Sequence, residues 1–193
     1  MWDDDDVVLL TAPGWGDSGP RHWQSYWERL YPLSRRVEQR DWLNPQREAW
    51  AAGVARAVEE IDSPFVIAAH SLGCHAAVAW LLQASLRQQR QLKGLLLVAP
   101  PALPVAFPAA RLGGASAPAC SGFERAAAQR LPVPALLAAS RNDPFCPQDE
   151  ARRMAAGWGA EFIDAGDAGH MGDEDGLGNW AAGQSLLQRL ILG

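Results

Sequence analysis

A serine, an aspartate and a histidine stand in three short motifs that are far apart in this sequence. Ser71 lies in AAHSLGC, Asp143 in SRNDPFC and His170 in DAGHMGDEDG. A serine hydroxyl becomes a strong nucleophile when a histidine takes its proton and a carboxylate orients that histidine. If the fold brings the three residues together, the serine hydroxyl can therefore attack a carbonyl group.

The residues around Ser71 are small where a nucleophile needs small neighbours. A nucleophile on a sharp strand-to-helix turn has a strained backbone, and the residues two before and two after it crowd together. Ala69 and Gly73 hold these positions, so that the motif is A-x-S-x-G in place of the usual G-x-S-x-G. We interpret Ser71 as the nucleophile. The simpler alternative is that Ser71 only caps the helix that follows it.

His170 is the histidine that we expect to act as the base. It lies in a glycine-rich loop after the last expected strand, where an imidazole can turn toward the end of a sheet. His70 adjoins Ser71, but adjacent side chains diverge on a sharp turn, and His75 lies on the following helix. We interpret His70 and His75 as structural or pocket-edge residues.

The acid that orients His170 has several candidates. Asp143 follows its own apolar run and precedes Pro144, which stiffens the loop. Aspartates that neighbour a histidine in sequence seldom reach its ring in the required orientation. We therefore prefer Asp143 to the four aspartates that lie nearer to His170 in sequence. These rivals are Asp164, Asp167, Asp173 and Asp175.

Two backbone amides are candidates for binding an oxyanion, which needs two N–H donors. Leu72 would open the helix after Ser71, where amides lack partners and the helix dipole is favourable. Trp15 lies between two glycines in PGWG, after the first expected strand, where the backbone can approach a substrate. A plain glycine turn explains PGWG equally well.

Apolar runs and helical periodicity alternate along the chain. Strands are expected at residues 7–11, 36–39, 65–69, 95–99, 135–139 and 161–164. Helices are expected at residues 20–30, from 44 onward, from the serine motif to about 88, at 148–158 and at 177–192. This alternation favours a doubly wound, mostly parallel sheet with helices on both faces.

The order of the candidate residues along the chain favours one particular sheet architecture. Ligands of open parallel sheets bind beyond the carboxyl ends of the strands, and Ser71, Asp143 and His170 each follow an expected strand. Serine, acid and histidine occur in the order that α/β-hydrolases use. We expect one α/β-hydrolase-like domain over residues 1–193. Residues 100–122 lack periodicity and are too few for a cap domain, so the fold is expected to be trimmed and uncapped.

Composition excludes several other classes of function. The net charge of −5 provides no basic face for nucleic acid. The longest apolar stretch, residues 94–110, contains four prolines and is not a membrane span. Cys74, Cys120 and Cys146 lack metal-ligand spacing, so free thiols and a cytoplasmic location are expected.

Four motifs carry a family resemblance: PGWGDSGPRHWQSYWE, AHSLGC, LPVPALLAASRNDPFC and GHMGDEDGLGNW. Together they resemble the small serine-hydrolase family of the α/β-hydrolase superfamily. That family includes bacterial hydrolases of unknown role and the animal retinoblastoma-binding serine hydrolase. The resemblance implies a trimmed α/β-hydrolase whose catalytic residues match Ser71, Asp143 and His170, with no metal and no bound cofactor.

The family motifs also contain candidate pocket and partner-binding residues. His22, Trp23 and Trp180 lie in these motifs and are expected to line a substrate pocket, although core packing explains tryptophans equally well. The retinoblastoma-binding motif L-x-C-x-E is absent, because residues 72–76 read LGCHA. A retinoblastoma-type partner is therefore not expected.

The expected activity is hydrolysis of a small ester or amide through an acyl-enzyme. One alternative is a non-catalytic, protein-binding module on a hydrolase fold. Another is a cysteine enzyme that uses Cys74 or Cys146, although Cys74 lies where core packing is the simpler explanation. Other reactions also use this fold, so the fold alone does not decide between them.

Overall fold

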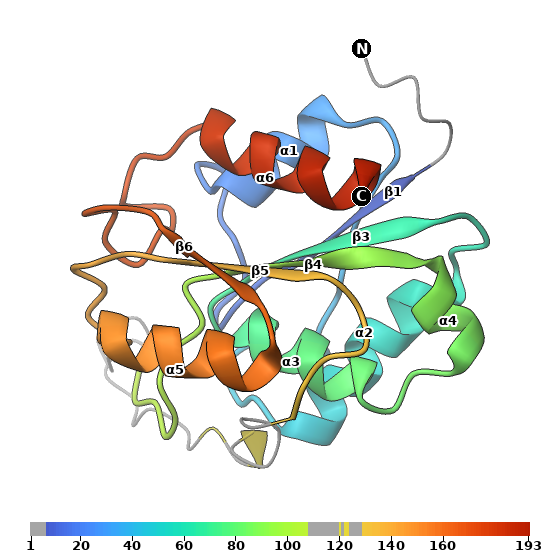
Figure 1. Cartoon of the computed structure of the whole chain (residues 1–193), viewed down its shortest axis with the longest axis horizontal. Helices are drawn as coiled ribbons and strands as arrows, with labels where there is room; N and C mark the ends of the chain where they lie inside the picture. Colours follow the sequence, from blue (N-terminus) through green and yellow to red (C-terminus); the bar gives the residue numbers. More distant parts are fainter. Residues whose placement is uncertain (1–6, 108–119, 121, 124–128) are drawn as a thin grey trace.

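A parallel sheet of six strands forms the centre of the computed structural model, which describes residues 7–107, 120, 122–123 and 129–193. The strand order is β2-β1-β3-β4-β5-β6 (Figure 1). The strands are β1 Val8–Ala12, β2 Ser34–Arg36, β3 Phe65–His70, β4 Leu92–Val98, β5 Ala135–Ala139 and β6 Glu161–Asp164. The helices are α1 Trp23–Leu30, α2 Arg47–Glu59, α3 Leu72–Leu81, α4 Leu86–Gln91, α5 Gln148–Trp158 and α6 Ala181–Leu192.

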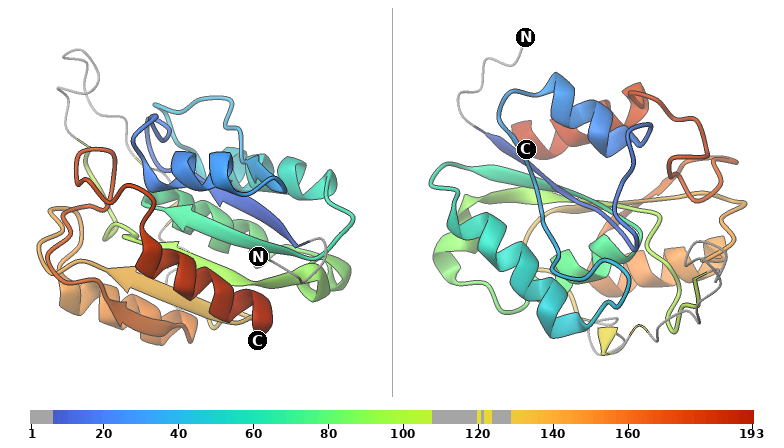
Figure 2. Two further views of the ribbon diagram at one scale, coloured as in Figure 1. Left: turned by 90° about the horizontal axis from the view of Figure 1, so that it is seen from above. Right: turned by 180° about the vertical axis from the view of Figure 1, so that it is seen from behind.

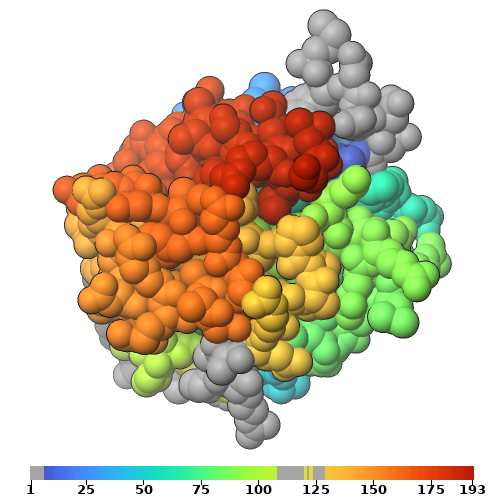
Figure 3. All heavy atoms as spheres, in the orientation of Figure 1, coloured from blue at the N-terminus to red at the C-terminus, as the bar shows by residue number. Residues whose placement is uncertain are grey.

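Helices cover both faces of the sheet. Helices α1 and α6 lie on one face, and α2, α3 and α5 lie on the other (Figures 1 and 2). In the space-filling view α6 and the segment from α5 to β6 occupy much of the visible surface (Figure 3). This arrangement confirms the predicted doubly wound α/β fold. No cap domain is built by the described part of the chain.

The central strand β3 is buried along its whole length. Successive side chains of a strand point to opposite faces. Accordingly, Phe65 and Ile67 pack with the core on the side of α2, α3 and α5, whereas Val66 and Ala68 pack with the side of α1 and α6. A strand that is buried on both faces has no polar face, which is why its sequence does not alternate.

The helix that was predicted to run from the serine motif to about residue 88 is instead two helices. Helix α3 ends at Leu81, and α4 begins after Ser85, whose backbone is extended. The Ser85 hydroxyl accepts from the amide of Gln88, and the Gln88 side chain accepts from the amide of Ser85. This capping box starts a new helix, and the prediction overlooked it.

Several other predicted boundaries were wrong, and among them strand β4 begins at Leu92 and not at residue 95. Helix α1 begins at Trp23 because the His22 ring caps it by accepting from the amide of Gln24. Helix α6 begins at residue 181 and not at 177, because glycines with positive φ precede it. Strand β2 covers residues 34–36, not 36–39.

Helix α2 begins at Arg47, a few residues later than predicted. Most of the aperiodic segment 100–122 lies outside the described residues. None of the helices within the described ranges is long and apolar enough to span a bilayer.

Candidate active site

Ser71 joins β3 to α3 in a strained conformation. Its φ is 52° and its ψ is −127°, a region that residues with side chains seldom adopt. The Ser71 amide donates to the carbonyl of Val98 at 2.9 Å, so the neighbouring strand β4 holds the turn. A Cβ atom on Gly73 would lie 2.2 Å from the carbonyl oxygen of Ala12, which explains the small residue at this position.

The structure brings Ser71, His170 and Asp143 together as the sequence predicted. His170 Nε2 lies 2.8 Å from Ser71 Oγ, and His170 Nδ1 lies 3.0 Å from each carboxylate oxygen of Asp143. The Asp143 side chain is 1% exposed and that of His170 is 16% exposed. Asp143 Oδ1 also accepts from the amide of Phe145 at 2.8 Å, which holds the carboxylate in place. A proton on Nδ1 leaves Nε2 free to accept the serine proton.

Two side chains that the sequence reasoning missed tie the loop of Asp143 to the loop of His170. Asn142 Oδ1 accepts from the amide of Gly169 at 2.8 Å. Ser140 Oγ accepts from the amide of Ala168 at 2.9 Å and donates to Asn142 Oδ1 at 2.7 Å. Both residues belong to the SRND stretch, but the sequence carries no sign that they bind backbone so far along the chain.

Three of the four rival aspartates bind other groups. Asp164 pairs with Arg141, and this hydrogen-bonded contact lowers the pKa of the Asp164 carboxyl. Asp173 accepts from the amide of Gly19 at 2.9 Å, and Asp175 accepts from that of Gly172 at 2.8 Å. The geometry therefore favours Asp143 over these rivals.

A cavity of about 270 Å³ opens over Ser71 and His170. One part of its lining is aromatic: Trp15 stacks on Phe107 with ring centroids 4.9 Å apart, and Phe145 also borders the cavity. Another part is acidic and consists of Asp17, Asp173, Glu174 and Asp175. The cavity thus combines an apolar surface with a negative one.

Only one of the three predicted pocket residues lines this cavity. His22 does so, beside His70. Trp23 is buried instead and donates through Nε1 to the carbonyl of Met171 at 3.1 Å. Trp180 packs against Trp23, with ring centroids 5.2 Å apart. The prediction that Trp23 and Trp180 line the pocket was wrong, and core packing accounts for both.

The two amides that were predicted to bind an oxyanion lie on segments next to Ser71. Leu72 is the first residue of α3, so its amide has no acceptor within the helix. The loop of Trp15 touches Ser71, since a Cβ atom on Gly14 would lie 2.7 Å from the Ser71 Cβ. The Trp15 indole donates to the carbonyl of Leu43 at 3.1 Å, which anchors this loop.

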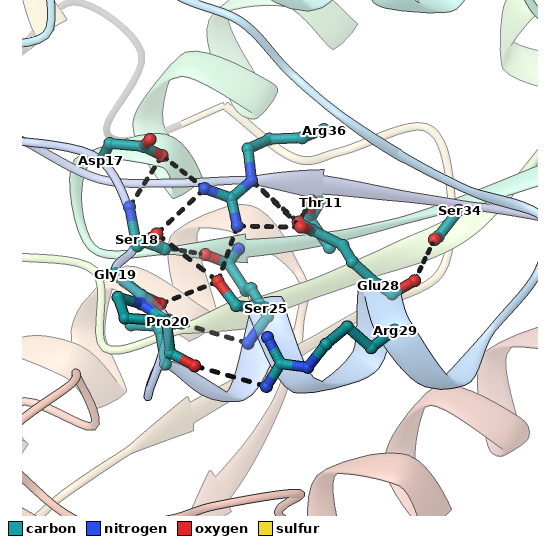
Figure 4. Close-up of polar contacts among 12 residues, drawn as sticks. Thr11, Asp17, Ser18, Gly19, Pro20, Ser25, Glu28, Arg29, Ser34 and Arg36 are labelled. Atoms are coloured by element: carbon teal, nitrogen blue, oxygen red, sulfur yellow. Dashed lines mark hydrogen bonds and ion pairs between the residues drawn. The ribbon is translucent and has the colours of Figure 1, made fainter.

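Arg36, on β2, holds the segment between β1 and α1 (Figure 4). Its guanidinium donates to Asp17 Oδ1 at 3.0 Å, to the carbonyl of Ser18 at 2.9 Å and to Ser25 Oγ at 2.7 Å. It also binds the carboxylate of Glu28 at 2.8 Å. This network supports the loop that carries the predicted oxyanion and pocket residues, and the sequence reasoning missed it.

The cysteines are poor candidates for the nucleophile. Cys74 is buried and donates to the carbonyl of Val98, and burial raises the pKa of its thiol. Burial, with the charge of Asp143 as a smaller contribution, raises the pKa of Cys146 to about 12. A thiolate is the reactive form, so neither residue is activated. Within the described residues, no group of His, Cys, Asp or Glu has the arrangement of a metal site.

Comparison with solved structures places the fold among hydrolases. A protein described as a YdeN-like hydrolase, from Pectobacterium atrosepticum, is 31% identical, with a TM-score of 0.80 over 96% of this chain and 90% of that one. The ydeN gene product of B. subtilis is 18% identical, with a TM-score of 0.72 over 97% and 100% of the two chains. A thermophilic esterase from Thermogutta terrifontis is 17% identical, with a TM-score of 0.65 over 96% and 90%.

Sequence comparison gives a consistent result. A search of curated proteins found no match. A family model described as Serine hydrolase matches residues 9–189, which include the strand, turn and loop that carry Ser71, Asp143 and His170. The chain therefore belongs to the Serine hydrolase family and has the α/β-hydrolase fold.

Proposed function

We propose that this protein is a carboxylesterase-like hydrolase that cleaves small esters or amides through an acyl-enzyme. One observation carries the proposal: Ser71 Oγ lies 2.8 Å from His170 Nε2, while His170 Nδ1 binds the buried Asp143 carboxylate. Nucleophile, base and orienting acid then stand in the required sequence of contacts. We assign this activity to one catalytic domain that comprises the whole chain.

The proposed reaction has two halves. Ser71 Oγ attacks the substrate carbonyl as its proton passes to His170 Nε2, and Asp143 stabilises the resulting imidazolium. The amides of Leu72 and Trp15 bind the oxyanion. His170 then returns the proton to the leaving alcohol or amine. Water attacks the acyl-enzyme by the same route, which releases the acid and restores Ser71.

The side chains also bear on the cofactor requirement and the cellular location of the protein. The proposed reaction uses only protein groups and water, so we assign it no cofactor. Cys74 and Cys146 are buried thiols, which are typical of proteins in a reducing compartment, and we infer a cytoplasmic location.

Labelling with a fluorophosphonate, followed by mass mapping of the modified peptide, tests the proposal. The adduct is expected on Ser71, and Ser71→Ala is expected to abolish both labelling and ester turnover. Ser34→Ala is the matched control, because Ser34 binds the Glu28 carbonyl outside the pocket. An adduct on Cys74, or an unlabelled wild-type protein without esterase activity, would refute the assignment and favour a binding module on this fold.

A further inference from the structure

Two buried histidines that the proposed reaction does not use form a hydrogen-bonded chain that ends on the base. His22 Nδ1 accepts from the amide of Gln24 at 3.1 Å. His22 Nε2 lies 3.2 Å from His70 Nδ1, and His70 Nε2 lies 2.8 Å from the carbonyl oxygen of His170. The chain thus runs from the start of α1, across the end of β3, to the backbone of His170.

The direction of every hydrogen bond in this chain follows from its two ends. The amide of Gln24 can only donate, so His22 Nδ1 accepts and the proton of the neutral ring lies on Nε2. The carbonyl of His170 can only accept, so His70 Nε2 carries a proton and Nδ1 of the neutral ring accepts. His22 Nε2–H therefore donates to His70 Nδ1. The Gln24 amide and the His170 carbonyl independently require the same direction of donation along the three hydrogen bonds. Both imidazole rings must therefore be neutral.

The backbone at His170 needs such support. Gly169 and Met171, on either side of it, have φ values of 59° and 56°. Left-handed backbone at a residue such as Met171 is strained and persists only where surrounding contacts hold it. Asn142 binds the amide before His170, and Trp23 binds the carbonyl after it. His70 binds the carbonyl of His170 itself.

We propose that His22 and His70 are positioning residues, and that their neutral chain holds the His170 backbone so that the imidazole bridges Ser71 and Asp143. His70 is not an alternative base, because its two ring nitrogens are engaged by His22 and by the His170 carbonyl. The role assigned to His170 rests on the proposed function. The hydrogen-bonded chain of histidines does not depend on the proposed function, and it can be tested without measuring catalysis.

Burial is the main reason why His22 stays neutral. The pKa of His22 is lowered to about 4, mainly by burial, with smaller contributions in the same direction from Arg36 and His170. The carboxylate of Asp173 acts in the opposite direction but is outweighed. A second proton on His22 would point at the Gln24 amide, and one on His70 would point at His22 Nε2–H. Either proton would replace an attractive contact by a repulsive one.

Paired substitutions at His70 separate the two hydrogen bonds. In His70→Gln the amide nitrogen takes the place of Nε2 and can still donate to the His170 carbonyl. In His70→Asn the amide oxygen takes the place of Nδ1 and can still accept from His22, but nothing reaches His170. We expect kcat of His70→Gln to exceed that of His70→Asn by about 10- to 100-fold, with KM nearly equal, because small misplacements of a catalytic group have effects of this size.

His75 provides a matched control. It is also buried, and its Nε2 lies 2.9 Å from a backbone carbonyl, that of Pro101, but it does not line the pocket. His75→Gln and His75→Asn are expected to have kcat values within about 3-fold of each other at a temperature where both are folded. Equal kcat values for the two His70 variants, or losses that follow only their Tm values, would overturn the proposal.

Nitrogen-15 NMR of the histidine rings tests the chain without any substrate. Near pH 7, His22 and His70 are expected to be neutral with the proton on Nε2, and His70→Asn should leave the His22 tautomer unchanged. A proton on Nδ1 of either ring, or a cationic His70, would overturn the proposal. A protein that shows the expected tautomers but neither labels nor turns over esters would refute the proposed function and leave the chain intact.

Discussion

Asn142 Oδ1 accepts a hydrogen bond from the amide of Gly169 at 2.8 Å. Asn142 precedes Asp143 and Gly169 precedes His170, so this bond links the two loops that carry the acid and the base. The acid and the base come from loops after different strands, β5 and β6. Their relative position therefore depends on contacts between these loops as well as on the sheet. This contact holds the acid and the base at the distance that their own hydrogen bond needs.

Removal of this contact is expected to lower activity more than stability. Asn142→Ala leaves the Gly169 amide without this partner and loosens the His170 loop, so kcat should fall roughly 10-fold or more. Asn142→Asp retains the acceptor and should keep more activity than Asn142→Ala. Steady-state kinetics and thermal unfolding of both variants measure the two effects. Equal kcat in Asn142→Ala and the wild type would show that the sheet alone places the two loops.

Asp143→Asn is expected to lower kcat by about 10⁴ without unfolding the protein, because an amide favours the wrong tautomer of His170. Asp173→Asn and Asp175→Asn should cost far less, since these carboxylates bind the amides of Gly19 and Gly172. Steady-state kinetics of the three variants on one ester measure these losses, and circular dichroism checks that each variant is folded. A large loss at Asp173 or Asp175 with an active Asp143→Asn variant would transfer the role of the acid.

Stability is expected to decrease below pH 6.5 because of His22. Its pKa is about 4 in the folded protein against an ordinary 6.5, so the unfolded chain binds a proton first. The stabilisation from neutral His22 is therefore complete above pH 6.5 and is lost as the pH falls to 4, by roughly 3 kcal/mol at most.

His22→Asn isolates this contribution. The asparagine oxygen can still cap α1, but the side chain does not titrate. Urea unfolding at several pH values between 7 and 4 should show that the wild type loses stability relative to the variant as the pH falls. Parallel pH profiles for the two proteins would contradict the lowered pKa.

Short acyl chains are expected to be the best substrates. The cavity of about 270 Å³ can bury only a few carbons, and each buried methylene adds about 0.8 kcal/mol of binding only while room remains. The value of kcat/KM on p-nitrophenyl esters should be highest between acetate and butyrate and fall by octanoate. An increase that continued through decanoate would reveal a long acyl channel.

Anionic esters are expected to be poor substrates. Asp17, Asp173, Glu174 and Asp175 line the cavity, and clefts lined by one sign of charge repel ligands of that sign. At low salt, kcat/KM for mono-p-nitrophenyl succinate should be about 10-fold or more below that for p-nitrophenyl butyrate. Added salt should narrow the gap by screening. Equal values at low salt would show that these carboxylates are neutralised.

The sequence by itself determined the features that depend on short stretches of chain. The apolar run before Ser71, the small residues on either side of it and the helix after it predicted the strand-to-helix turn. The chain order of Ser71, Asp143 and His170 predicted their meeting, because parallel strands end at the same edge of a sheet. Each of these signals lies within a few residues or follows from a general rule of topology.

Only the tertiary structure decided which side chains surround these three residues. His22 and His70 are 48 residues apart, and His70 and His170 are 100 apart, yet hydrogen bonds join them. Trp23 and Trp180 occur in family motifs but pack against each other outside the pocket lining, whereas acidic residues of the His170 loop line the pocket. Such contacts leave no periodic or local pattern in a sequence, because they depend on where the loops of separate strands come to lie.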